Sequence, residues 1–361
     1  MLSACSEETS PVNVNFDSAT HTAEVTHGVI KYNGAINIPK TVLLDDQKYQ
    51  VKTIGDKAFL DCLGLTSVHI PEGVTHIGMD AFSGCDALLQ VNFPDGLRTI
   101  GGEAFRACRS ITSVTLPNSV TSLGEEAFRG CRRLREIHLG KGLTTFGAGV
   151  FRNCDDLESI DIPMGVTELS NELFAGCDRL NTISIPASVT SIGRKTFKGC
   201  MDLVNVTLPN NLVHIGDEAF RHCRKLTTVV LSSNLITIGN GAFRDCPNLN
   251  NVVIPESVEH IGWEAFVDCK SLTTVHVMGS PLQEFYSFEG TPLQDIYCWS
   301  DQPSVIETPE GTETPEHSEH YVNATLHVLE ENIERYRAAE PWCRFERIVA
   351  ITPEELANKP I

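Results

Sequence analysis

Ten cysteines recur along this chain at intervals of 23 residues without one insertion or deletion, and this period limits what the chain can fold into. A phenylalanine stands three residues before each of them, from Phe59 to Phe266. A fixed period of this length is typical of a solenoid, in which each turn of chain stacks on its neighbours. The cysteines of this ladder are Cys62, Cys85, Cys108, Cys131, Cys154, Cys177, Cys200, Cys223, Cys246 and Cys269.

Each repeat contains a short segment that alternates between apolar and polar residues. After Cys108 the apolar positions are Ile111, Val114 and Leu116, and the last two are separated by a polar residue. Alternation of this kind predicts a strand with one buried face. Pro117 follows at once and ends the strand, because proline has no backbone N–H to donate.

The rest of the repeat predicts a turn and a short helical piece. Gly124 permits a sharp turn, and the polar segment that follows this position often carries acids, such as Asp217 and Glu218. Acids at that point suit the N-terminus of a helical turn. We therefore expect one strand, one turn and one helical piece per repeat. Stacked strands would form a parallel sheet that rises by roughly 4.8 Å per repeat.

The repeated phrase Leu-x-x-Val-x-Ile-Pro-x-x-Val-x-x-Ile-Gly-x-x-Ala-Phe-x-x-Cys, which covers residues 53–277, resembles the BspA-like class of leucine-rich repeats. The resemblance implies a right-handed α/β solenoid that is mostly β with short helical turns. It would hold about ten regular repeats between atypical caps. This class is found on the surfaces of Bacteroides-type bacteria and some protozoan parasites, and the activity commonly proposed for it is adhesion to host proteins or other cells.

The flanks are similar to the caps of that family. We divide the chain into a leader with the start of a cap (1–30), a capping repeat with a hairpin insertion (31–62), the repeat array (53–277) and a C-terminal part (278–361). The C-terminal part would hold a degraded repeat, in which Thr291 replaces the cysteine, then a loop at 301–320 and a closing cap. The helix of that cap should end at Glu340, before Pro341. The residues that keep the pattern of the degraded repeat or the cap are Phe288, Leu293, Ile296, Leu326, Val328, Tyr336, Trp342 and Phe345.

The cysteines of the ladder do not have the spacing of a metal site. Zinc ligands come in pairs two to four residues apart, and no ladder cysteine has such a neighbour. Stacked side chains that point the same way disfavour the geometry of a disulfide, although neighbouring α-carbons are close enough for one. We therefore interpret the ladder as buried free thiols, with disulfides and metal as the alternatives. Cys298 and Cys343 lie outside the ladder and could pair with each other.

Positions five and seven after each cysteine should face outward from the predicted sheet. Most of these residues are small and polar, and aromatic anchors are absent. They form the surface on which we expect a ligand to bind. The binding candidates are His69, Gln90, Asn92, Glu136, His138, Asp161, Asn205, Asn251 and His276.

Two sets of stacked residues have side chains that occur in catalytic or metal sites, one in the outward columns and one fourteen residues after the cysteines. His138, Asp161 and Ser184 share one column, but the acid stands in the middle, whereas a serine hydrolase needs histidine between serine and acid. The column of His76, His214 and His260 leaves at least two repeats, roughly 10 Å, between members, which is too far for one ion. No phosphate loop, serine elbow or His-Glu-x-x-His motif occurs, so we expect no catalysis, cofactor or metal.

The net charge of −19 argues against nucleic acid as the main partner, and no run of 18 apolar residues could span a membrane. A basic stripe beside the cysteines is either a ridge for an acidic polymer or an ion-paired surface. Glu103, Glu126 and Glu218 lie three residues before arginines of the stripe, which favours ion pairs. The stripe consists of Arg106, Arg129, Arg152, Lys198, Arg221 and Arg244, with Arg109, Arg132 and Arg224 next to it.

The first five residues, Met-Leu-Ser-Ala-Cys, read like the end of a bacterial lipoprotein signal, so Cys5 would be the lipid anchor if the native chain is longer. We expect a monomeric, non-enzymatic protein, secreted or held on the cell surface as an outer-membrane lipoprotein. It would present a rigid repeat surface to a protein or glycan, which could come from a host. A self-associating coat or stalk component is the alternative, and a hydrolase is a remote one.

Overall fold

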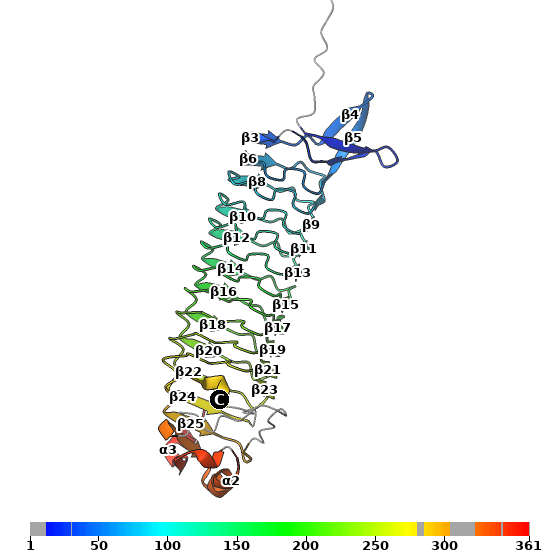
Figure 1. Ribbon diagram of the computed structural model, residues 1–361. Helices are drawn as coiled ribbons and strands as arrows, with labels where there is room; N and C mark the ends of the chain where they lie inside the picture. The colour runs from blue at the N-terminus through cyan, green and yellow to red at the C-terminus, as the bar shows by residue number, and fades with distance from the viewer. Residues whose placement is uncertain (1–11, 30, 280–284, 304–321, 341, 361) are drawn as a thin grey trace, which may run out of the picture. The chain divides into compact units, whose positions relative to one another are not determined.

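The computed structural model describes residues 12–29, 31–279, 285–303, 322–340 and 342–360 (Figure 1). The chain divides into two compact units, Met1–Gly165 and Val166–Ile361. Each unit is a solenoid in which residues 23 apart in sequence lie side by side, as Val114 lies beside Ile137. Cys5 and most of the loop predicted at 301–320 lie outside the described residues.

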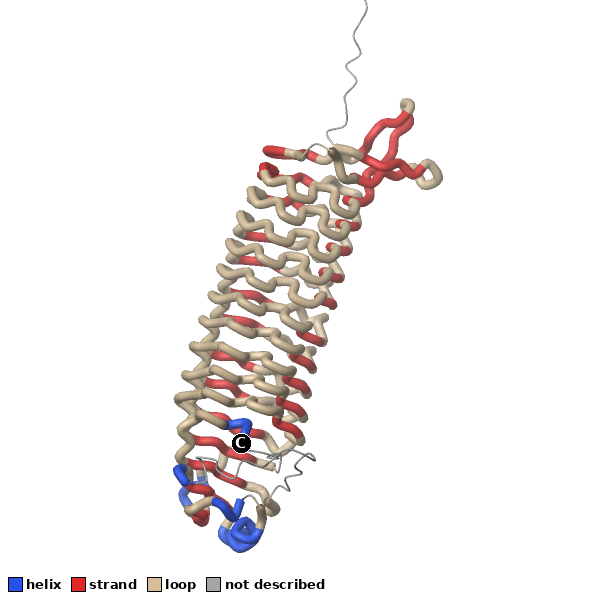
Figure 2. Tube along the Cα trace, viewed as in Figure 1, coloured by secondary structure: helices blue, strands red, loops and turns tan. Residues whose placement is uncertain are grey.

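In the first unit every regular repeat supplies two short strands, which form two parallel rows joined by turns (Figure 2). The first strand row holds the strands that the alternation predicted. It consists of β3 (Asn33–Asn37), β6 (Gly64–His69), β8 (Gln90–Asn92), β10 (Ser113–Thr115), β12 (Glu136–His138) and β14 (Ser159–Asp161). The second strand row was not predicted. It consists of β5 (Gln47–Ile54), β7 (His76–Ile77), β9 (Thr99–Ile100), β11 (Ser122–Leu123) and β13 (Thr145–Phe146).

The second unit repeats this arrangement. Its first strand row consists of β16 (Thr182–Ser184), β18 (Asn205–Thr207), β20 (Thr228–Val230), β22 (Asn251–Ile254), β24 (Thr274–Val277), β25 (Asp295–Cys298), β26 (Thr325–Val328) and β27 (Arg347–Ala350). Its second strand row consists of β15 (Glu168–Leu169), β17 (Ser191–Ile192), β19 (His214–Ile215), β21 (Thr237–Ile238) and β23 (His260–Ile261). Within the first strand row, β18, β20, β22, β24, β25, β26 and β27 pair in this order, all parallel.

The helical piece expected in each repeat is wrong for the array, where the segment before each cysteine is a succession of turns. We call this third side of each unit the turn face. Residues five and one before the cysteine lie in the left-handed region, as at Glu103 (φ 54°) and Ala107 (φ 56°), and a helix cannot pass through such residues. The backbone bonds instead to the next repeat, for example from the Phe82 N–H to the Ala104 carbonyl at 2.7 Å.

The glycine that precedes the turn face is required by close packing of the backbone. A Cβ at Gly101 would lie 2.7 Å from the carbonyl carbon of Gly78 in the preceding repeat. The φ of Gly101 is not positive, so this glycine is not required by a left-handed turn, as the sequence had suggested. At Gly101 the neighbouring repeat approaches too closely for a side chain without a shift of the backbone.

The core of each unit is built from the repeated apolar positions. The phenylalanine rings lie almost parallel, with centroids 4.9 Å apart for Phe59 and Phe82 and 5.1 Å apart for Phe220 and Phe243. All ten cysteines of the ladder are buried, each 2% exposed or less. The repeat spacing is close to the spacing of stacked rings, so successive Phe rings within a unit lie face to face, as Phe82 and Phe105 do.

The first unit begins with a cap that contains two hairpins. β1 (Val14–Asp17) pairs antiparallel with β2 (Thr22–Val25), and β4 (Thr41–Leu44) pairs antiparallel with β5, at the place where the sequence predicted a hairpin (Figure 1). Asp45 and Asp46 close the β4–β5 turn with φ of 51° and 62°, as a two-residue hairpin turn requires.

The second unit ends with a cap that contains the few helices of the structure. After η1 (Phe285–Phe288) the strands β25 to β27 continue the first strand row, and η2 (Glu330–Asn332), α2 (Ile333–Ala338), η3 (Trp342–Arg344) and α3 (Pro353–Ala357) surround them. Helix α2 ends at Ala338, two residues earlier than predicted, because Ala339 is already extended. The expected cap residues Tyr336, Trp342 and Phe345 are buried.

Candidate binding surface

The binding candidates lie on the outward side of the first strand row. In the first unit Glu136 and His138 are exposed on β12, while Ile137 between them is buried. The other candidates follow the same alternation, and all except His276 are exposed. The exposed candidates are His69, Gln90, Asn92, Glu136, His138, Asp161, Asn205 and Asn251.

Several of these side chains hold one another in place. The Gln90 amide donates to Asn92 Oδ1 at 2.9 Å, and Asn205 Oδ1 accepts a hydrogen bond from the Thr228 hydroxyl at 2.8 Å. His138 Nε2 lies 3.0 Å from a carboxylate oxygen of Glu136. The strands beneath are fixed by parallel ladders, so these polar groups sit on a backbone with little freedom to move. Such a surface loses little entropy when it binds a ligand.

His276 is half-buried because the outward column continues into an aromatic stack that sequence analysis missed. The Tyr297 ring stacks on His276 at 4.6 Å and on His327 at 4.2 Å, and the Trp299 indole donates to His276 Nδ1 at 3.3 Å. Burial, followed by the charge of His327, lowers the pKa of His276. The sequence did contain a signal for this stack. Tyr297 follows the pattern residue Ile296, and His327 stands between the pattern residues Leu326 and Val328, so both occupy outward positions of their strands.

Helix α3 covers this aromatic stack. Tyr297 donates its hydroxyl to Glu355 at 2.8 Å, and Lys359 Nζ lies 5.1 Å from the centre of the Trp299 ring. Burial and the bond to Glu355 raise the pKa of Tyr297. Thr352 and Glu355 form a capping box that begins α3. The C-terminal segment therefore closes one end of the outward columns.

The arrangements considered for catalysis and metal binding are not assembled into sites. His138 and Asp161 lie on adjacent strands of the first unit, and the imidazole of His138 is turned to Glu136. Ser184 belongs to the second unit. His214 Nδ1 bonds to the Thr237 hydroxyl at 2.7 Å. Within the described ranges no group of three or more His, Cys, Asp or Glu could hold a metal ion.

The thiols of the ladder act as hydrogen-bond donors between repeats. Cys131 Sγ donates to the Phe105 carbonyl at 3.2 Å, and Cys246 Sγ donates to the Phe220 carbonyl at 3.1 Å. Burial raises the pKa of Cys131 to about 12, so this thiol stays protonated at physiological pH. Among the cysteines of the described residues none forms a disulfide, and Cys298 is buried while Cys343 is exposed.

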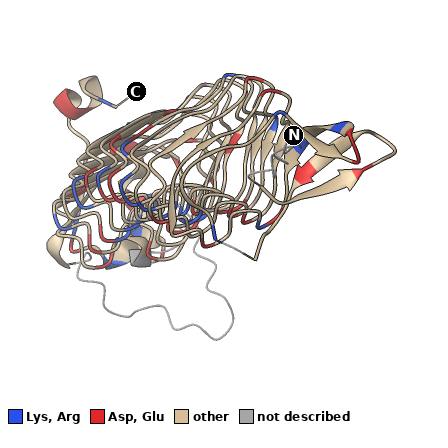
Figure 3. Ribbon diagram, turned by 90° about the horizontal axis from the view of Figure 1, so that it is seen from above, with Lys and Arg blue, Asp and Glu red and all other residues tan. Residues whose placement is uncertain are grey.

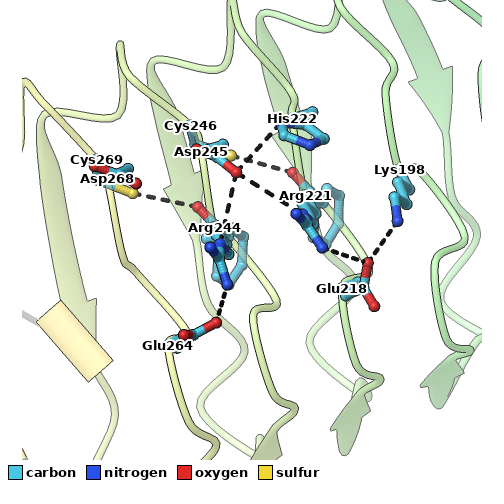
Figure 4. A network of polar contacts seen from close by, with 12 residues as sticks. Lys198, Glu218, Arg221, His222, Arg244, Asp245, Cys246, Glu264, Asp268 and Cys269 are labelled. Atoms are coloured by element: carbon cyan, nitrogen blue, oxygen red, sulfur yellow. Dashed lines mark hydrogen bonds and ion pairs between the residues drawn. The ribbon is translucent and has the colours of Figure 1, made fainter. Parts of the chain in front are cut away.

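The basic stripe is an ion-paired surface on the turn face. Arg129 bonds to Glu126 at 2.7 Å, and Arg109 bonds across repeats to Asp86 at 2.8 Å. In the second unit Glu218 accepts bonds from Lys198 at 2.6 Å and from Arg221 at 3.1 Å (Figure 4).

Asp245 links the next two repeats of this network, because its carboxylate lies 3.8 Å from Arg221 Nε and 3.7 Å from Arg244 Nε. Figure 3 shows basic and acidic residues side by side on the turns. The stripe therefore carries much less net charge than its arginines suggest.

No helix in the described residues is both long and apolar enough to cross a membrane. A model of the BspA type leucine rich repeat region matches residues 52–181 and 167–294, in six copies. No curated protein matches the chain.

Several solved structures are similar to the chain. The pneumococcal vaccine antigen PcpA is 19% identical over 91% of this chain and 92% of its own, with a TM-score of 0.57, so it shows the fold alone. A leucine-rich repeat protein of T. pallidum is 31% identical over 53% of this chain and 87% of its own (TM-score 0.49). A leucine-rich cell surface protein of Faecalibacterium prausnitzii is 25% identical over 79% and 92% (TM-score 0.46). With two thirds of its length matched by the family model, the chain belongs to the BspA-type leucine-rich repeat family.

Proposed function

We propose that this protein is a non-enzymatic binding protein of the cell surface that holds a macromolecular partner, a protein or a glycan, on the outward side of its first strand row. One observation carries the proposal. The strands of this row expose mostly polar side chains at every second position, on a backbone fixed by ladders to both neighbouring repeats. Stacked repeats with an exposed regular surface are used for binding other macromolecules.

The chemistry of the columns indicates which part of a partner they would contact. In the first unit Glu136 and Asp161 are exposed on neighbouring strands, and both are acidic. Carboxylates attract basic groups and accept hydrogen bonds from amides and hydroxyls. The array columns lack the aromatic side chains that dominate strong interfaces, so binding would be spread over many repeats.

The cell-surface location is part of this proposal. The described residues contain no membrane-spanning helix, so attachment would need another device, and a lipid on Cys5 would provide it. Mass spectrometry of the protein extracted from its native membrane tests this directly. A diacylglycerol mass on the N-terminal peptide supports the anchor, and a native chain with an unmodified cysteine rejects it.

The binding surface is tested with fluorescently labelled protein on cultured epithelial cells, measured by flow cytometry. The face variant carries Glu136→Ala, His138→Ala and Asp161→Ala. The matched control carries Arg98→Ala, Thr121→Ala and Thr144→Ala, three exposed residues of the same unit that lie outside the first strand row. We expect the face variant to bind about tenfold more weakly, as the loss of roughly 1.4 kcal/mol would produce, and the control to bind like the wild type.

Equal binding by the face variant and the wild type would reject this face as the binding surface. Absence of binding to cells, proteins and glycans, together with concentration-dependent assembly in light scattering, would instead favour a self-associating coat or stalk. A monomer at all concentrations with saturable cell binding is the outcome that the proposal requires.

A further inference from the structure

Helix α3 lies over the aromatic stack of the second unit without burying a residue of its own. None of its described residues is buried, and Leu356 is 46% exposed. The Glu355 carboxylate accepts the bond from the Tyr297 hydroxyl. Beyond the helix, the Lys359 ammonium lies against the Trp299 ring. A segment that buries little apolar surface opens at low cost, so small changes in its polar contacts decide how firmly it is held.

His327 lies beneath α3 between two carboxylates, and its surroundings fix which ring nitrogen carries the proton. Nε2 lies 2.9 Å from Asp295 Oδ1 on β25. Because an ionised carboxylate only accepts hydrogen bonds, Nε2 of the neutral ring must be the protonated nitrogen. Nδ1 lies 3.7 Å from Glu355 Oε1 on α3, and it is buried without a hydrogen-bond partner. The lone pair of Nδ1 in the neutral ring therefore points towards Glu355.

Glu355 is ionised when it faces this nitrogen. Burial raises the pKa of its carboxyl. Bonds from Thr352 and Tyr297, together with the charge of His327, outweigh burial and hold this pKa below its ordinary value. A lone pair that faces a carboxylate is repelled by it, since both groups are acceptors. With a neutral ring on His327, this contact opposes the closure of α3.

The other groups around His327 leave its ring as the site where a proton is gained. Tyr297 stacks on the ring at 4.2 Å, and burial raises the pKa of its hydroxyl. His276 accepts the Trp299 indole N–H at Nδ1, and burial lowers its pKa, so it stays neutral. On β27 the neighbour of His327 is Val349, which carries no charge.

We propose that α3 is an acid-tightened latch, which closes more firmly over the aromatic stack when His327 carries a second proton than when its ring is neutral. The protonated ring donates from Nε2 to Asp295 and presents an N–H at Nδ1 to Glu355, so repulsion becomes attraction. Because only the closed latch gains this contact, closure favours uptake of the proton. The contribution is present in acid and is lost as the pH rises through the range in which histidine changes charge, about pH 5 to pH 8. The aromatic end of the outward columns is therefore less accessible in acid.

The latch is tested by hydrogen exchange of the C-terminal peptide that follows Ile351, measured by mass spectrometry on the whole protein at about pH 5 and about pH 8. Each rate is divided into that of the free synthetic peptide at the same pH, which gives a protection factor. His327→Gln keeps an N–H for Asp295 but cannot take up a proton. Glu355→Gln removes the charge and keeps the capping box, because glutamine also serves at this position. His260→Gln is the matched control, an exposed histidine of the same unit on β23.

We expect the protection factor to be about tenfold higher in acid in the wild type and in His260→Gln, a coupling of ordinary size. In His327→Gln and Glu355→Gln it should be the same at both pH values. Equal protection at both pH values in the wild type overturns the proposal, as does stronger protection at the higher pH. A tenfold rise in acid that persists in folded His327→Gln overturns the assignment to this ring. The measurement needs no ligand, so its outcome does not depend on the binding proposed for the outward columns.

Discussion

Replacement of one ladder cysteine by alanine should measure what the thiol ladder contributes to stability. Cys131 is fully buried, and its Sγ donates to the Phe105 carbonyl at 3.2 Å. Cys131→Ala removes the sulfur and its hydrogen bond. The Phe105 carbonyl still accepts the Cys108 N–H at 3.2 Å, so no backbone acceptor is left without a partner. The substitution therefore leaves a small void and no buried unsatisfied carbonyl.

The expected loss has three parts of similar size. A sulfur atom occupies roughly 25 Å³, so the void costs about 0.6 kcal/mol at roughly 24 cal/mol per Å³. The lost burial of one sulfur, treated like a methylene, costs about 0.8 kcal/mol. A weak hydrogen bond adds about 0.5 kcal/mol. Unfolding free energy should therefore fall by about 2 kcal/mol, and the midpoint of thermal unfolding by about 4–8 °C for a unit of this size.

Urea and thermal unfolding followed by circular dichroism measure this difference, with Cys343→Ala as the control at an exposed cysteine. The control should change the unfolding free energy by less than about 0.5 kcal/mol. A loss below about 0.5 kcal/mol in Cys131→Ala would refute the idea that the ladder thiols fill and bond the core. Failure of the Cys131→Ala protein to fold would also contradict the estimate, because a void of this size is too small to unfold the protein.

Three further predictions concern the thiols, the ion-paired surface and the C-terminal cap. Because the ladder is buried, iodoacetamide should label only Cys343 in the native Cys5→Ser protein. In denaturant it should label all twelve cysteines that this variant retains. Labelling of the ladder in the native protein would contradict its burial. Burial opposes ionisation of Glu218, but the hydrogen bonds from Lys198 and Arg221 outweigh it and lower the pKa of this carboxyl to about 2. The contribution of ionised Glu218 to the free energy of unfolding is therefore present at neutral pH and is lost as the pH falls from the ordinary pKa of 4.5 towards 2. Glu218→Gln should thus lower stability by about 1 kcal/mol in urea melts at neutral pH, and a deficit that persists near pH 2 would argue against this ion network. Truncation after Ile351 should uncover Trp299 and increase its quenching by iodide, measured in a Trp263→Phe background, whereas unchanged quenching would mean that α3 does not cover the indole.

The period predicted the fold class and most of the core from the sequence. The first strand row, the Phe stack and the outward position of residues such as His138 all follow from counting residues after each cysteine. The second strand row was missed because strands of two residues, such as His76–Ile77, are too short to show an alternation. The helical turns were wrong because nothing in a residue such as Ala107 indicates a left-handed backbone, which the contact between repeats imposes there.

The candidate binding surface was likewise predicted in part from the sequence and determined in part by tertiary packing. Exposure of the array columns follows from their register, but the cover of α3 over Tyr297 and His327 depends on how a distant C-terminal segment packs.

A strict repeat determines by itself which residues stack on which, since each repeat must bury the same apolar face against the next. Only the tertiary structure decides which polar groups meet across repeats and which aromatic side chains stay exposed, because these depend on backbone angles and on segments outside the repeat.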